Sequence, residues 1–177
     1  YLGYLQIDVD EFDLAELALD LKQVQLANSS VSFTQFPKVS KAKDNTESKA
    51  AAYPQPPLLL SLDRLSLTDN QFAFSNESYL RQAEVLDFNH LNFQDLNLEA
   101  RQISWQADSL QAQIKQMSLE DHSGFKVNRF ETKAFFGAQQ IRARDLLLRT
   151  PQTNIQLDYT ADYADFSAWA QNLAEGI

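Results

Sequence analysis

The chain has 177 residues, with 15 basic and 24 acidic side chains, a formal net charge of −9 and no cysteine. This length suffices for one domain with a sizeable core, but the acidic balance argues against nucleic-acid binding, which depends on clustered Lys and Arg. The absence of cysteine excludes a disulfide scaffold, a thiolate metal site and a Cys nucleophile.

The first predicted element is a strand over Leu5–Val9, followed by a short helix near residues 10–17. Asp10 or Asp13 would be its N-cap. The acidic residues of this region lack the glycine and the distal Glu of an EF-hand loop. We therefore interpret them as solvated side chains and a helix cap, and we predict no metal site.

Five copies of one apolar pattern follow, in which two alternating apolar pairs are separated by two polar residues. Alternation with a period of two predicts strands, and repetition predicts an array of similar units. The doubled polar step predicts a β-bulge or a sharp bend, because both halves must face the same apolar side. Residues 14–27 also suit a helix, but the later copies do not, so we favour strands. The copies are Leu19, Leu21, Val24 and Leu26; Leu60, Leu62, Leu65 and Leu67; Leu86, Phe88, Leu91 and Phe93; Ala112, Ile114, Met117 and Leu119; and Ile141, Ala143, Leu146 and Leu148.

Turn-forming residues connect these copies to further alternating strands. "ANSS" leads to Val31 and Phe33, "TDNQ" to Phe72 and Phe74, "EDHSG" to Phe125 and Val127, and "RTPQTN" to Ile155, Leu157 and Tyr159. These connections predict hairpins and a mostly antiparallel sheet.

Two further segments complete the predicted organisation. The polar, then Pro-rich, segment at about 38–57 predicts a flexible loop between the first two copies. A second short helix is predicted near 165–174, where Phe166 and Trp169 share one face.

The few residues that could take part in catalysis or metal binding do not form a catalytic pattern. His90 and His122 have no companion at ligand spacing, and we interpret them as surface or turn residues. Ser123 lies beside Gly124 without the G-x-S-x-G context of a nucleophile elbow. We expect neither an enzyme nor a cofactor.

The runs "FNHLNFQDLNLEA", "SLEDHSGF" and "LLLRTPQTNIQLDY" resemble the TamB proteins of the AsmA-like superfamily, and Ile7–Phe33 resembles their earlier repeats. The resemblance covers most of residues 4–175 apart from 38–57. It implies a periplasmic segment of a long repeat protein, anchored in the inner membrane by regions outside this chain. Curved strands would form an open apolar groove, a β-taco, that carries phospholipid in outer-membrane biogenesis. An outer-membrane partner of the TamA type would also bind outside this chain.

Together, the pattern and the resemblance predict a mainly β chain of curved antiparallel strands, which forms one groove segment over 1–177. The alternatives are a chaperone-like module that pairs with strands of outer-membrane proteins, and a structural spacer. The sequence leaves open whether the apolar side chains line a groove or fill a closed sandwich. We expect Trp105, together with Phe166 and Trp169 of the second helix, to pack the ends of the groove or to cap it. The predicted lipid-groove residues are Leu19, Leu21, Val24, Leu26, Val31, Phe33, Leu60, Leu62, Leu65, Leu67, Phe72, Phe74, Leu86, Phe88, Leu91, Phe93, Ile114, Met117, Leu119, Ile141, Leu146, Leu148, Ile155 and Leu157.

Overall fold

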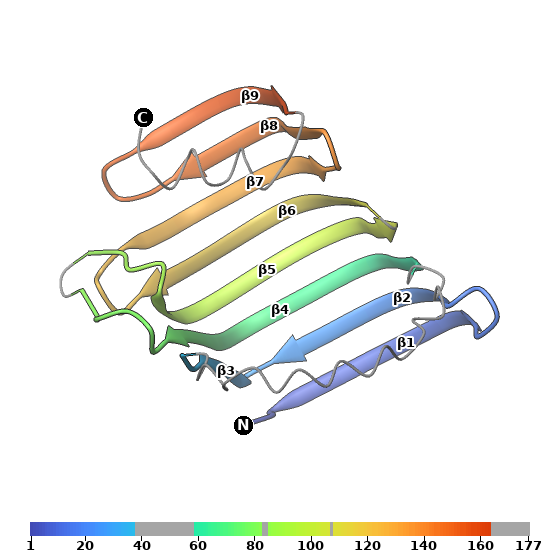
Figure 1. Ribbon diagram of the computed structural model, residues 1–177, viewed down its shortest axis with the longest axis horizontal. Helices are drawn as coiled ribbons and strands as arrows, with labels where there is room; N and C mark the ends of the chain where they lie inside the picture. Colours follow the sequence, from blue (N-terminus) through green and yellow to red (C-terminus); the bar gives the residue numbers. More distant parts are fainter. Residues whose placement is uncertain (38–58, 83–84, 107, 164–177) are drawn as a thin grey trace, which may run out of the picture.

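The computed structural model describes residues 1–37, 59–82, 85–106 and 108–163, which form one open, curved, mixed sheet of nine strands (Figure 1). The order is β1-β2-β4-β5-β6-β7-β8-β9, with β3 beside β4, and these residues contain no helix. The strands are β1 (Tyr4–Asp13), β2 (Ala18–Ala27), β3 (Ser30–Gln35), β4 (Leu59–Asn76), β5 (His90–Gln106), β6 (Ser109–Asp121), β7 (Lys126–Phe136), β8 (Gln140–Arg149) and β9 (Asn154–Asp162).

The first two copies of the sequence pattern lie side by side in the sheet. β2 and β3 both pair with β4 in the parallel sense, with Leu19 opposite Leu60 and Phe33 opposite Phe74, a constant offset of 41 residues. The similar sequences therefore fold into similar strands in matching register. All other neighbouring pairs are antiparallel, so the expectation of a mostly antiparallel sheet holds with this exception.

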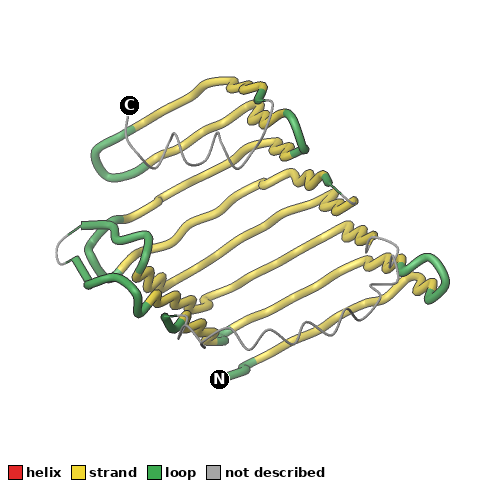
Figure 2. The backbone as a smooth tube through the Cα atoms, in the orientation of Figure 1, coloured by secondary structure: helices red, strands yellow, loops and turns green. Residues whose placement is uncertain are grey.

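The doubled polar steps coincide with irregularities in the strands. Lys22 is skipped in the β1–β2 register and Lys115 in the β5–β6 register, and Asp145 has a φ of 53° at the β7–β8 shift. Each irregularity returns the next apolar side chain to the same face. In Figure 2 the tubes of the long strands are foreshortened into close waves near their ends, as expected where strands bend toward or away from the viewer. The bulge prediction is confirmed in the first, fourth and fifth copies.

The third copy was predicted in the wrong frame. Leu86 and Phe88 lie before β5, which begins at His90. Within β5 the same pattern runs through Leu91, Phe93, Leu96 and Leu98, and Asp95 in its doubled step has a φ of 49°. The sequence allows the pattern to be placed at either set of positions, and the turn before β5 determines which set lies within the strand.

Two of the four predicted hairpins are also wrong. "ANSS" and "TDNQ" are breaks within strands that continue in the same direction, with Asn28 at a φ of 50° and Asp69 at 53°. Asn and Asp tolerate this left-handed conformation in turns and bulges alike, so their presence does not tell the two apart. "EDHSG" and "RTPQTN" do connect antiparallel neighbours, β6 to β7 and β8 to β9.

The helix predicted near residues 10–17 does not form. β1 continues to Asp13, and residues 14–17 form a turn before β2. Asp13 therefore caps no helix but stabilises this turn, because its Oδ1 accepts hydrogen bonds from the backbone N–H of Ala15 (2.7 Å) and of Glu16 (3.2 Å). The loop predicted at 38–57 and the helix predicted near 165–174, with Phe166 and Trp169, lie outside the described residues.

Candidate functional site

Apolar side chains from eight strands meet in rows that cross the sheet. Residues directly opposite each other on neighbouring strands present their side chains on the same face. Two rows run from β1 to β9 without a polar residue. They are Phe12, Leu19, Leu60, Trp105, Leu110, Phe136, Ile141 and Ala161, and Leu5, Leu26, Leu67, Leu98, Met117, Phe130, Leu148 and Ile155.

Shorter rows fill the space between and beside these two, and we call the whole surface the apolar face. Buried Thr132 is a polar residue within it, and its Oγ1 donates a hydrogen bond to the carbonyl of Arg144 (3.2 Å). The shorter rows are Val9, Leu21, Leu62 and Ile103; Ile7, Val24, Leu65, Ala100 and Ile114; Ala112, Ala134, Ala143 and Tyr159; Leu119 and Val127; Leu146 and Leu157; Val31, Phe72 and Phe93; and Phe33, Phe74 and Leu91.

The structure brings almost all the predicted groove residues onto this face. The exceptions are Leu86 and Phe88, which lie on the loop before β5, where Phe88 is 74% exposed. Sequence analysis missed several members although they follow the same alternation. Phe12 lies in the segment read as a helix, Leu98 and Ile103 lie beyond the part of β5 that the predicted third copy covers, and the others lie outside the five copies. The missed members include Leu5, Ile7, Val9, Phe12, Leu98, Ile103, Leu110, Phe130 and Phe136.

Few of these side chains are fully buried. Among the described residues the buried hydrophobic side chains are Leu62, Ala100, Leu119, Val127 and Ile141, all on the apolar face. Exposure is between 46% and 56% for the apolar residues of β1 and between 37% and 45% for Ile155, Leu157 and Tyr159 of β9, and Trp105 and Phe136 of the central strands are about half exposed as well. No second described sheet covers this face.

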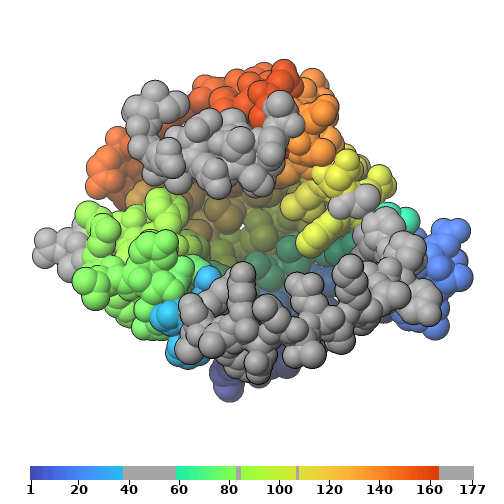
Figure 3. All heavy atoms as spheres, in the orientation of Figure 1, coloured from blue at the N-terminus to red at the C-terminus, as the bar shows by residue number. Residues whose placement is uncertain are grey.

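The space-filling view shows how the molecule is hollowed. In Figure 3 the centre of the visible face is set back behind a rim that includes the green loop before β5 and the yellow tips of β5 and β6. A recessed centre behind a raised rim is expected for a sheet whose strands bend near their ends.

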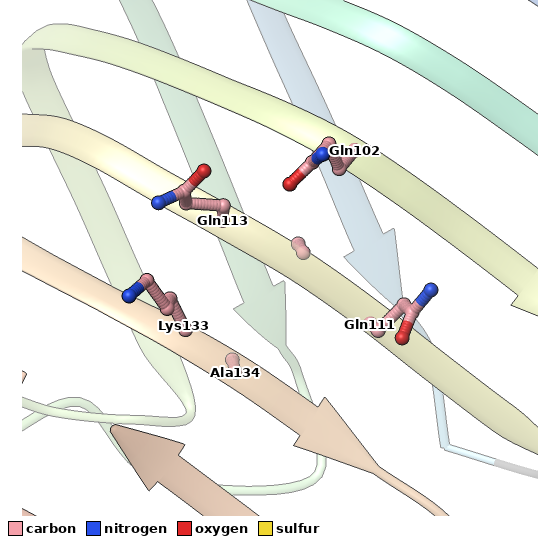
Figure 4. A pocket seen from close by; sticks show the side chains of 6 residues that line it. Gln102, Gln111, Gln113, Lys133 and Ala134 are labelled. Atoms are coloured by element: carbon pink, nitrogen blue, oxygen red, sulfur yellow. The ribbon is translucent and has the colours of Figure 1, made fainter. Parts of the chain in front are cut away.

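The opposite face of the sheet is polar and partly ion-paired. Lys22 Nζ lies 2.7 Å from Asp10, and Lys133 Nζ lies 2.7 Å from Asp145. A hollow of about 320 Å³ lies beside the β5–β6 irregularity, and Figure 4 shows Gln102, Gln111, Gln113 and Lys133 around it. Its lining has one charged side chain, already ion-paired, and no acid–base or nucleophilic constellation.

A buried polar pair fixes the start of β5. His90 Nδ1 lies 2.9 Å from Asp87 Oδ2, and both side chains are almost fully buried, which corrects the expectation that His90 is a surface residue. The Asp87 carboxylate also accepts hydrogen bonds from the backbone N–H of Gln82 (3.0 Å) and of Asn89 (2.9 Å). The Gln82 bond, followed by the His90 contact, lowers the pKa of Asp87 to about 2.

A second buried carboxylate fixes the β6–β7 hairpin to β5. Asp121 accepts hydrogen bonds from the backbone N–H of Asn92 (2.9 Å), and from Ser123 through both its N–H (3.0 Å) and its Oγ (2.6 Å). Burial raises the pKa of Asp121, but these bonds and His122 outweigh burial and lower it. His122 is partly exposed, as expected for a turn residue. Both carboxylates therefore hold neighbouring segments of the chain together, and this structural role accounts for their hydrogen bonds.

Two further kinds of feature, a metal-ligand cluster and a membrane-spanning helix, are absent from the described residues. No three of their His, Asp or Glu side chains gather as metal ligands. The described ranges contain no helix long and apolar enough to cross a membrane. Comparisons with protein families, with curated proteins and with solved structures find no match to this chain.

Proposed function

We propose that the apolar face is the inner side of the curved sheet and forms a groove that carries the acyl chains of phospholipids. The observation that carries this proposal is the pair of apolar rows that cross eight strands without a polar residue. Every described buried hydrophobic residue lies on this face. This also supports the proposal, because side chains crowd together on the inner side of a bend.

The energetics suit a sliding apolar cargo. Each methylene removed from water contributes about 0.8 kcal/mol, and an acyl chain needs no polar partner. Neighbouring strands lie about 4.8 Å apart, so a row of eight strands spans roughly 34 Å. One leaflet of a membrane has acyl chains spanning roughly 15 Å, so such a row exceeds the length of the cargo. Uniform apolar rows would let the chain move without deep traps.

The cellular setting follows from the resemblance to TamB proteins. We infer that the chain is a periplasmic segment of a bridge anchored in the inner membrane, and that it acts in outer-membrane biogenesis. A partner of the TamA type would bind regions outside this chain. The proposal involves no catalysis.

Retained lipid tests this proposal. The purified chain should carry phospholipid that native mass spectrometry detects and that delipidation removes. Leu157→Asp, which places a charge on the apolar face of β9, should reduce the retained lipid. Gln156→Asp, on the opposite face of the same strand, is the matched control and should retain it. Equal lipid in both variants, or none in the unaltered chain, would contradict the proposal.

The edges of the sheet favour a second candidate function. Among the described strands, β1 and β9 each have one neighbour and carry half-exposed apolar side chains, which is the arrangement that accepts an added strand. A chaperone-like module would bind unfolded outer-membrane strands at these edges. Such binding should survive charges placed at Leu98 and Met117 in the centre of the face, whereas lipid retention should not. A structural spacer would bind neither ligand.

A further inference from the structure

A hollow of about 340 Å³ opens at one end of the apolar face. It lies between the tip of the β5–β6 hairpin and the tip of the β7–β8 hairpin, with residues of both tips in its lining. Its volume falls within the range of roughly 300–1,000 Å³ that small-molecule sites occupy. It therefore has room for a small polar group next to the apolar rows.

Three aromatic side chains from separate segments line this hollow. Trp105 and Phe136 are each opposite Leu110 in register, within the first complete row, and about half of each aromatic side chain is exposed. Tyr163 follows β9 and is joined to the β7–β8 turn, because its N–H donates to the carbonyl of Gln139 (3.0 Å) and its hydroxyl donates to the carbonyl of Gly137. The aromatic lining is thus held by two hairpins and the end of β9.

The lining also contains one acidic side chain and no basic one. Asp108 is exposed at the β5–β6 tip, and Ala138 lines the hollow from the β7–β8 tip. Aromatic faces carry negative charge density and attract organic cations, with Trp the strongest of the three. A carboxylate beside such rings adds a full negative charge, which favours a cation over a neutral or anionic group.

We propose that this hollow binds a substituted ammonium cation. In the lipid-carrying state this cation would be the choline group of a phospholipid whose acyl chain lies along the adjoining apolar row. This last step rests on the proposed function, whereas the recognition of the ammonium group does not. A quaternary ammonium has no N–H to donate, so rings and a carboxylate are sufficient to recognise it.

Calorimetric titration with free choline tests the recognition itself. The carbon isostere 3,3-dimethylbutanol has the same form without the charge, so choline should bind and the isostere should bind much more weakly. Asp108→Asn and Phe136→Leu should each weaken choline binding by about tenfold. Asp20→Asn on the polar face and Phe125→Leu in the β6–β7 hairpin are the matched controls and should have no effect. Equal binding of choline and its isostere, or binding unchanged by Asp108→Asn, would overturn the proposal.

A lipid arm separates this inference from the proposed function. Short-chain phosphatidylcholine should bind more tightly than the phosphatidylglycerol of equal chain length, and Asp108→Asn should remove the preference. If both lipids bind equally and choline does not bind, the ammonium site is wrong and lipid carriage stands. If choline binds but no lipid is retained, the site stands and lipid carriage is wrong.

Discussion

Two neighbouring breaks in the sheet depend on one buried amide side chain. Asn70 is almost fully buried, its Oδ1 accepts the backbone N–H of Ser29 (3.0 Å), and its Nδ2 donates to the carbonyl of Leu26 (2.9 Å). These bonds satisfy backbone groups that the break between β2 and β3 removes from the regular ladder. Ser29, which stands at the equivalent position of the first copy, is also buried and donates to the carbonyl of Ala27 (3.0 Å).

Asn70→Ala should therefore lower the free energy of unfolding by about 1–3 kcal/mol, because it leaves buried backbone groups without partners. Urea unfolding followed by circular dichroism measures this change. Asn128→Ala, at an exposed position of β7, should alter stability by less than about 0.5 kcal/mol. An equal effect of the two substitutions would show that the Asn70 bonds contribute nothing.

The buried carboxylate of Asp87 makes stability depend on acid. Its folded pKa of about 2 lies below its ordinary value of 3.8. A lowered folded pKa gives stability that is present above the unfolded pKa and is lost as the pH falls through the folded pKa. The Asp87 contribution should therefore be complete above about pH 4 and disappear between about pH 4 and pH 2.

Thermal unfolding between pH 5 and pH 2 measures this dependence. Asp87→Asn removes the titrating group, so the melting temperature of that variant should fall less steeply below pH 4 than that of the unaltered chain. Asn128→Ala, which changes no titrating group, should leave the slope unchanged. If the Asp87→Asn profile parallels the unaltered one, Asp87 is not a source of the acid sensitivity.

At the scale of the strand, register decides which face each side chain occupies. A shift of one residue turns a whole strand over. Deleting Asn28 would slide β3 by one residue against β4 and turn Val31 and Phe33 toward the polar face. We expect hydrogen exchange to show lost protection over residues 30–35 and 71–76. Asn28→Gly keeps the length and suits the positive φ, so it should retain protection. Full protection after the deletion would mean that the offset of 41 residues is not enforced.

The patterns of individual strands also account for what could be predicted from the sequence. Alternation with doubled polar steps identified β2, β4, β6 and β8, because each strand exposes one face and buries the other. The parallel pairing of β2 with β4 could not be predicted, since Asn28 and Asp69 suit a turn as well as a bulge. The frame of β5 depended on the buried contact between Asp87 and His90, which joins residues whose burial no local pattern indicates.

At the scale of the whole molecule, the described sheet has a wide apolar face and few fully buried hydrophobic residues. Hydrophobic stabilisation is proportional to the apolar area removed from water, so much of the available stabilisation is unused in the absence of a ligand. A ligand that binds only the folded state adds stability that increases with its free concentration. The face that would carry lipid should therefore also be the main source of ligand-dependent stability.

Short-chain phospholipid, kept below its micelle-forming concentration, should raise the melting temperature of the chain. At a hundredfold excess over the dissociation constant the added stability is about 2.7 kcal/mol, which corresponds to roughly 5–10 °C for a chain of this size. Glycerophosphocholine, which has the headgroup without acyl chains, should produce a much smaller shift. Val9→Asp, at a half-exposed position of the apolar face, should reduce the shift produced by the lipid, whereas Gln6→Asp on the other face of β1 should preserve it. Equal shifts with and without acyl chains would locate the stabilising contact outside the apolar face, because only the chains can remove its leucine and phenylalanine side chains from water.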